Sequence, residues 1–213
     1  MAELARITAG HLLESRAIVL QPDHPFTWAS GWLSPIYCDN RVTLSYPAVR
    51  NHIKEAFQKT ILEKFGKPDL IAGVATGAIA HGALVADLME LPMIYVRATA
   101  KDHGRQNLIE GRMEPGQKIV VVEDLISTGG SSLRAVEALR EAGGLVEGMV
   151  AIFTYGFPVA SAAFVKAGVK VFTLSNYHTL IDMALETGYI LENQVELLSK
   201  WREDPSGWKG LYT

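Results

Sequence analysis

The part of the sequence best suited to chemistry is an acidic pair followed by small and hydroxyl residues. Glu123 and Asp124 end the apolar run 119–122, and residues 125–132 read Leu-Ile-Ser-Thr-Gly-Gly-Ser-Ser. Two adjacent carboxylates are good hydrogen-bond acceptors for the two hydroxyls of a ribose. Their charge would also stabilise a sugar carbon that becomes positive as its leaving group departs. They would be poor ligands for a phosphate, which is itself an anion.

The loop after the acidic pair is suited to binding that phosphate. Gly129 and Gly130 carry no Cβ, so the backbone can turn tightly and approach an anion closely. Backbone amides and the N-terminus of a helix beginning at Ser131 would supply donors and partial positive charge. The loop contains no lysine, unlike the Walker loop that binds a triphosphate. The simpler alternative is an ordinary strand–turn–helix unit with a Ser or Thr as helix cap.

A second group of candidate residues lies in the polar segment 97–112. Its basic side chains could stabilise a pyrophosphate, on which charge builds as its bond to a sugar breaks. A polar loop of this length often acts as a lid over a site. On charge alone, a solvated surface loop is the simpler interpretation. The basic residues are Arg97, Lys101, His103, Arg105 and Arg112.

Apolar strands and helices that alternate along the chain must position these residues. We expect helices at about 2–18, 45–65, 78–89, 131–142, 159–167, 177–187 and 191–203, with Ser45 capping the second. We expect strands at 70–75, 92–96, 119–122, 145–154 and 169–174, and a polar loop at 97–117. This order predicts an α/β fold with a mainly parallel twisted sheet flanked by helices. Ligands of such folds bind at the carboxyl ends of the strands.

Length and composition limit the remaining possibilities. The 213 residues fit a single domain, with an N-terminal segment at about 1–45, a core at about 46–175 and C-terminal helices at about 176–213. A net charge of -3 gives no general attraction to nucleic acid or to anionic membranes. Cys38 is the only cysteine, and we find neither a secretory signal nor an apolar membrane span. A cytoplasmic protein is therefore expected.

The run 119–132 closely resembles the motif with which type I phosphoribosyltransferases bind phosphoribosyl pyrophosphate (PRPP). The resemblance implies the type I phosphoribosyltransferase fold. It assigns Glu123 and Asp124 to the ribose hydroxyls, and it places Ser127 beside the base as an orotate contact. The loop assigned to the 5-phosphate comprises Leu125, Ile126, Ser127, Thr128, Gly129, Gly130 and Ser131.

The segment 97–112 resembles the mobile catalytic loop of the orotate-using members of this family. Arg97, Lys101 and His103 match in type and order, and the resemblance assigns them to catalysis and to PRPP binding. It also implies a homodimer in which the 97–112 loop reaches the neighbouring subunit's site. Many family members carry a second basic residue where this chain has Ala98.

The N-terminal segment 25–41 resembles the hood with which the orotate enzymes cover their base. Its aromatic rings could pack on a pyrimidine, while Arg41 and backbone amides around 34–37 could meet the carboxylate and carbonyls. The alternative is that Trp28, Trp32 and Tyr37 pack the N-terminal helix onto the core. Some members have a lysine where Ala29 stands. The turn 73–82 also fits the family, where its amides bind pyrophosphate, although close helix–strand packing would explain its small residues equally well.

The resemblance implies transfer of ribose-5-phosphate from PRPP to orotate, giving orotidine 5′-phosphate and pyrophosphate in pyrimidine biosynthesis. Mg²⁺ would be the cofactor, ligated largely by PRPP itself. The partners would be PRPP, orotate and a second copy of the chain, without nucleic acid or membrane. Two alternatives stay open: transfer to another base such as a purine, or a PRPP-sensing regulator that binds nucleic acid. The missing basic residues at Ala29 and Ala98 favour the regulator, whereas the net acidity and the absence of an added basic module disfavour it.

Overall fold

The computed structural model describes residues 2–28, 31–97 and 108–210, which form one central six-stranded sheet with helices around it. The sheet order is β10-β9-β8-β5-β6-β7, and only β7 runs antiparallel to its neighbour. The mainly parallel α/β fold expected from the sequence is therefore confirmed. The strands are β5 (Leu70–Val74), β6 (Met93–Val96), β7 (Ile109–Glu110), β8 (Lys118–Ile126), β9 (Leu145–Thr154) and β10 (Val171–Asn176).

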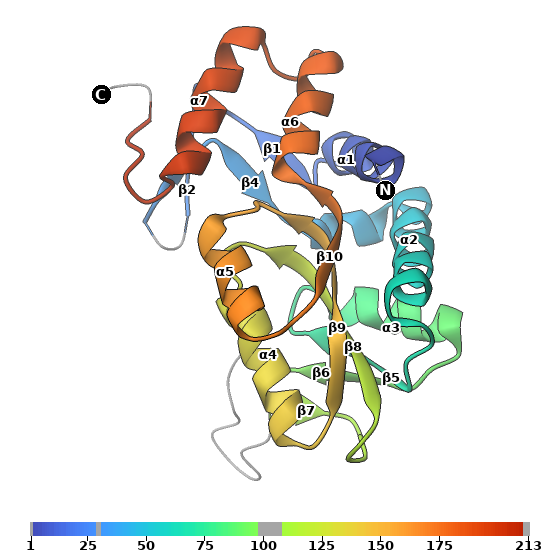
Figure 1. Cartoon of the computed structure of the whole chain (residues 1–213). Helices are drawn as coiled ribbons and strands as arrows, with labels where there is room; N and C mark the ends of the chain where they lie inside the picture. Colours follow the sequence, from blue (N-terminus) through green and yellow to red (C-terminus); the bar gives the residue numbers. More distant parts are fainter. Residues whose placement is uncertain (1, 29–30, 98–107, 211–213) are drawn as a thin grey trace.

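The central strand β8 contributes apolar side chains to both faces of the sheet. Val120 and Val122 join one core, and Ile119 and Val121 join the other, because successive side chains of a strand point to opposite faces. Helices α4 (Gly130–Glu141) and α5 (Pro158–Lys166) cover one face, opposite α2 (Pro47–Phe65) and α3 (Ile79–Met89) (Figure 1). Within the described residues, no helix combines the length and apolarity that a membrane span requires.

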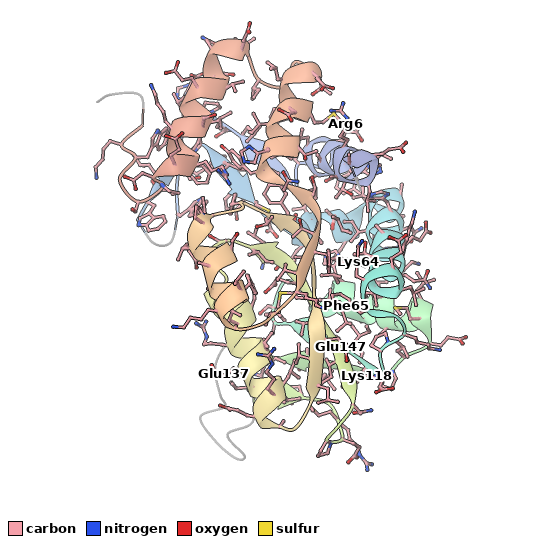
Figure 2. The ribbon with its side chains drawn as sticks, viewed as in Figure 1. Arg6, Lys64, Phe65, Lys118, Glu137 and Glu147 are labelled. Atoms are coloured by element: carbon pink, nitrogen blue, oxygen red, sulfur yellow. The ribbon has the colours of Figure 1, made fainter. Side chains whose placement is uncertain are left out.

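Helix α2 is held against the sheet at its C-terminal end. Phe65 lies over β9 (Figure 2), and its ring is 5.5 Å from the ring of Phe172 on β10. Lys64 Nζ lies 5.4 Å from the same Phe172 ring. A Cβ on Gly148 of β9 would overlap the Phe65 ring, so glycine there permits this close approach.

Two helix ends differ from the sequence-based expectation. The first helix, α1 (Ala2–Glu14), stops before Arg16, whose positive φ of 58° is incompatible with continuing the helix, and Ile18 already belongs to a strand. The expectation of a helix to residue 18 was therefore wrong. Ser45 does not cap α2: Tyr46 is the N-cap and Pro47 the first helical residue, where its missing N–H costs no hydrogen bond.

The strands around the expected site also differ from the prediction. Strand β8 continues to Ile126, so Glu123 and Asp124 lie inside the strand rather than after it. Their neighbour β9 pairs with them in parallel as far as Thr154, which explains the extension. The expected polar loop 97–117 contains the edge strand β7, which pairs with β6. In the sequence, residues 98–107 fall between these two strands.

Short strands and the last two helices gather at the carboxyl ends of the parallel strands (Figure 1). Here β1 (Ile18–Leu20) pairs with β4 (Ile36–Cys38), and β2 (Phe26–Thr27) pairs with β3 (Leu33–Ser34). A 3₁₀ helix, η1 (Asn40–Ser45), follows, and α6 (Tyr177–Glu186) and α7 (Glu192–Glu203) pack nearby. We call the described residues of 18–45 the hood.

A cluster of aromatic side chains packs α7 against the hood and against the end of β9. Trp201 is fully buried, its ring lies 5.7 Å from both Trp28 and Tyr155, and its Nε1–H donates to the Leu33 carbonyl at 3.2 Å. Arg202 donates to the carbonyls of Tyr155 and Gly156 at 3.0 and 2.7 Å. The C-terminal helix therefore contributes to the site end of the molecule, which the sequence did not indicate.

Replacing Trp201 with alanine should lower the free energy of unfolding by about 3–5 kcal/mol, because it leaves a cavity and removes the bond to Leu33. Denaturant unfolding followed by circular dichroism measures this loss. Val165→Ala is the control, since Val165 is 81% exposed and its loss should change stability by less than about 0.5 kcal/mol. A similar small change for Trp201→Ala would contradict the anchoring role.

Candidate active site

Glu123 is the buried member of the acidic pair. Its side chain is 3% exposed, Oε1 accepts from the Asp124 backbone N–H at 3.0 Å, and Oε2 accepts from Ser132 Oγ at 2.7 Å. Burial, followed by the neighbouring Asp124 charge, raises the pKa of Glu123 to about 8. The two hydrogen bonds thus hold the Glu123 carboxyl in place, and its raised pKa lies near neutral pH.

Asp124 lies at the meeting point of three segments. Its carboxylate lies against Gly77, where a Cβ would come within 2.6 Å of Oδ1 and closer still to Oδ2. Its backbone carbonyl accepts from Asn40 Nδ2 of the hood at 2.6 Å. The structure therefore brings together the acidic pair, the hood and the turn between β5 and α3.

The turn after β8 offers unpaired backbone donors. Gly129 adopts a left-handed φ of 81°, and a Cβ there would lie 2.9 Å from Phe164 Cε2, so the turn requires glycine. Within the described part of the chain, no acceptor pairs with the backbone N–H groups of residues 127–131. These amides, at the N-terminus of α4, form a cradle that fits an anion such as a phosphate.

The turn between β5 and α3 provides a second set of donors. The backbone N–H groups of Thr76 and Gly77 have no acceptor among the described residues, and the Ala75–Thr76 peptide bond is cis. The small residues also serve packing, as the alternative interpretation held, because Gly82 of α3 approaches the Gly73 backbone closely. Both interpretations of this turn therefore have structural support.

Of the three loop residues that the resemblance assigns to catalysis, Arg97 is the one that the structure describes. It follows β6, and its backbone N–H donates to Leu108 O at 2.8 Å, which continues the β6–β7 pairing. Its NH1 lies 3.7 Å from Glu110 Oε1. The further basic candidate Arg112 pairs through Nε with Glu114 Oε1 at 2.9 Å. Lys101 and His103, together with Ala98 and the hood position Ala29, lie outside the described residues.

The aromatic and basic residues of the hood differ in their contacts and in their exposure to solvent. Trp28 packs on Tyr155 with ring centroids 5.6 Å apart, which gives this residue a packing role against the end of β9, whereas Tyr37 is 46% exposed. Arg41, which stays a predicted contact for a ligand carboxylate, forms a two-point ion pair with Asp39 at 2.7 and 2.8 Å. This pair also lowers the pKa of Asp39.

Several residues near the acidic pair were not singled out in the sequence, although two of them lie within the segments 25–41 and 73–82. Asn40 and His81 are both buried, and a side-chain atom of each, Asn40 Oδ1 and His81 Nε2, has no hydrogen-bond partner within the described residues. Burial lowers the pKa of His81, while the Asn40 backbone and the Asp124 charge oppose that shift. Ser132 directly follows the expected phosphate loop. Helical periodicity from that point places its side chain on the face toward β8, and this pattern could have identified it.

Comparison with known proteins agrees with this geometry. A family model described as the phosphoribosyl transferase domain matches residues 44–177, from the end of the hood to the start of α6. The chain therefore belongs to the phosphoribosyltransferase family.

Individual proteins similar to this chain show which branch of the family it belongs to. It is 61% identical over 208 residues to an orotate phosphoribosyltransferase of Bacteroides thetaiotaomicron, covering 98% of both chains. A solved orotate phosphoribosyltransferase of Aeropyrum pernix superposes with a TM-score of 0.75 at 25% identity, covering 86% of this chain and 99% of that one. A UMP synthase of Leishmania donovani gives a TM-score of 0.78 at 27% identity, with 93% of this chain matching 42% of that longer chain. The chain thus belongs to the orotate phosphoribosyltransferase branch.

Replacing Gly77 with alanine should lower kcat/KM for phosphoribosyl transfer on the order of 100-fold, because the methyl group displaces the Asp124 carboxylate. Steady-state kinetics on protein of unchanged circular dichroism measures the effect. Gly10→Ala is the matched control, since a Cβ at Gly10 meets nothing within 4 Å, and its activity should equal that of the parent. Equal activities of the two variants would contradict the close packing of Gly77 on Asp124.

Replacing Glu123 with glutamine should make the stability of the fold less sensitive to pH between about 4.5 and about 8. The folded-state pKa of about 8 exceeds the ordinary 4.5, so the stabilisation is fully present below about pH 4.5 and is lost as the pH rises toward about 8. Urea unfolding across this range should show a steeper decline in the free energy of unfolding for the parent than for the Glu123→Gln variant. Parallel declines would show that the carboxyl ionises normally in the fold.

Proposed function

We propose that this chain transfers ribose-5-phosphate from PRPP to orotate, giving orotidine 5′-phosphate and pyrophosphate in pyrimidine biosynthesis. One observation carries the proposal: a turn of unpaired backbone donors follows an acidic pair whose first member is buried, beneath a hood at the carboxyl ends of the strands. The 61% identity to an enzyme of that name supports orotate as the base.

In this proposal the residues at the end of β8 hold the ribose-5-phosphate. The loop Leu125, Ile126, Ser127, Thr128, Gly129, Gly130 and Ser131 binds the 5-phosphate through its amides and hydroxyls. Glu123 and Asp124 accept hydrogen bonds from the ribose hydroxyls. The charge of Asp124, together with that of the ionised fraction of Glu123, stabilises the positive character that the anomeric carbon acquires as pyrophosphate leaves.

The departing pyrophosphate meets donors from two segments. The backbone amides of Thr76 and Gly77 have no acceptor among the described residues, and this turn lies beside Asp124. These amides can therefore donate to the oxygens of pyrophosphate. Arg97, Lys101 and His103 balance the charge that develops on the pyrophosphate. Orotate, covered by the hood and beside Ser127, attacks through a ring nitrogen from the opposite face, and no covalent enzyme intermediate is needed.

The residues present fit a Mg²⁺ ion that arrives with PRPP. Mg²⁺ prefers oxygen ligands and retains several waters. Among the described residues, no cluster of three or more acidic, histidine or cysteine side chains forms a ready-made cage, so oxygens of the substrate would supply its ligands. The ion would neutralise charge on the pyrophosphate.

The assembly we propose is a homodimer in which the 97–112 loop completes the neighbouring subunit's site. The pairing of β6 with β7 at the edge of the sheet supports this, because the described ends of the 97–112 segment lie at that edge. Sedimentation gives the oligomeric state. Mixing the impaired Lys101→Ala and Asp124→Asn proteins should raise activity above that of either alone only if the loop acts across subunits. We also propose a cytoplasmic location, in keeping with the free thiol of Cys38, and cell fractionation tests it.

A spectrophotometric assay of orotate consumption with PRPP and Mg²⁺ tests the function directly. Turnover of adenine or xanthine in preference to orotate would instead indicate a purine enzyme. Tight nucleic-acid binding at physiological salt, with no turnover of any base, would indicate a PRPP-sensing regulator.

Replacing Lys101 with alanine should lower kcat by roughly 100-fold while the Kd for PRPP changes by less than about tenfold, because its charge acts on the departing pyrophosphate. Steady-state kinetics and calorimetric PRPP binding separate the two quantities. Lys59→Ala, which removes an exposed lysine of α2, is the control and should leave both unchanged. Equal losses in kcat and in affinity would count against this role.

A further inference from the structure

Ser132 is a buried hydroxyl outside the loop assigned to the 5-phosphate. It stands in the first turn of α4, is 1% exposed, and donates from Oγ to Glu123 Oε2 at 2.7 Å. Its neighbour Ser131 is exposed and belongs to the proposed phosphate cradle. Two adjacent serines of one helical turn therefore point to different surroundings.

We propose that Ser132 is a positioning residue that holds the Glu123 carboxylate in place for the ribose hydroxyls of PRPP. The inference rests on the proposed function only in taking PRPP as the ligand, whichever base accepts the sugar. Ser132 lies on the helix whose N-terminus faces the phosphate, so its bond to β8 fixes the spacing between the phosphate cradle and the acidic pair. That spacing must match one ribose-5-phosphate.

The electrostatic surroundings give Ser132 a second effect on the same carboxylate. Burial and the Asp124 charge raise the pKa of Glu123, and the Ser132 hydrogen bond opposes that rise. The charged and titratable groups that act on the pair through Asp124 are His81 of α3, Cys38 of β4 and Arg41 of η1. A hydrogen bond to the ionised form favours it, so Ser132 keeps more of Glu123 ionised at neutral pH. The ionised carboxylate is the stronger acceptor for ribose hydroxyls.

Removing the hydroxyl should therefore change the pH dependence of PRPP binding as well as its strength. For Ser132→Ala, the Kd for PRPP near pH 7 should rise about tenfold, as expected for loss of a hydrogen bond to a charged group. The limb of the pH profile that reports Glu123 ionisation should move to higher pH, so that the deficit narrows under alkaline conditions. Ser132→Thr keeps a hydroxyl and should restore the parent profile.

The experiment is calorimetric titration of PRPP into the full-length protein from about pH 5 to about pH 10, followed by kcat/KM for PRPP over the same range. Ser175→Ala is the matched control, because Ser175 is also fully buried and donates to a backbone carbonyl, Ala5 O, at 2.9 Å. It should lose stability but keep the parent's pH profile. In a Glu123→Gln background, adding Ser132→Ala should produce no pH shift.

The outcomes separate this inference from the proposed function. A parent that binds PRPP but does not use orotate overturns the proposed base and leaves the binding test of Ser132 intact. A folded Ser132→Ala protein with the parent's pH profile and affinity overturns the positioning role. Should Ser132→Ala fail to fold, Ser132→Cys, with its weak S–H donor, takes its place and should show a smaller shift in the same direction.

Discussion

The structure depends on keeping two adjacent carboxylates at the end of a buried strand. Removing Glu123 from water disfavours its charge, and Asp124 beside it adds repulsion, so its pKa rises to about 8. Two donors, the Ser132 hydroxyl and the Asp124 backbone N–H, offset part of this cost by binding the Glu123 carboxyl. Asn40 donates to the Asp124 backbone carbonyl and so ties the hood to β8. Such an acidic pair is tolerated where a ligand uses it.

The parallel sheet explains why the parts of the site meet at this point. Strands β5 and β8 are neighbours, so the turns after them open at the same edge and bring Gly77 against Asp124. The hood reaches the same edge through η1, where Asn40 contacts the β8 backbone. Donors suited to phosphate, acceptors suited to ribose and a cover suited to a base therefore adjoin one strand end.

Much of this arrangement could be predicted from the sequence because its signals are local. The apolar run before Glu123 predicted a buried parallel strand, and the glycines after it predicted a tight turn before a helix. The contributions of Asn40, His81 and Trp201 could not be predicted, since each depends on contacts between segments distant in the chain. The early end of α1 depends on the left-handed conformation of Arg16, which has no glycine to signal it. Arg41 is similar: its type fits an anion, but only the fold pairs it with Asp39.

The hydrogen bond from Trp201 to the Leu33 carbonyl joins a segment that the ribosome synthesises early to one that it synthesises late. A nascent chain that has emerged only through β10 already contains the sheet and both turns with unpaired backbone N–H groups, but its N-terminal strands lack the C-terminal helix that packs on them. Domains acquire their structure as their segments emerge. The packing of α7 against the hood is thus gained last, after synthesis has passed residue 201, and shortened products released earlier would leave the residues beneath α7 uncovered.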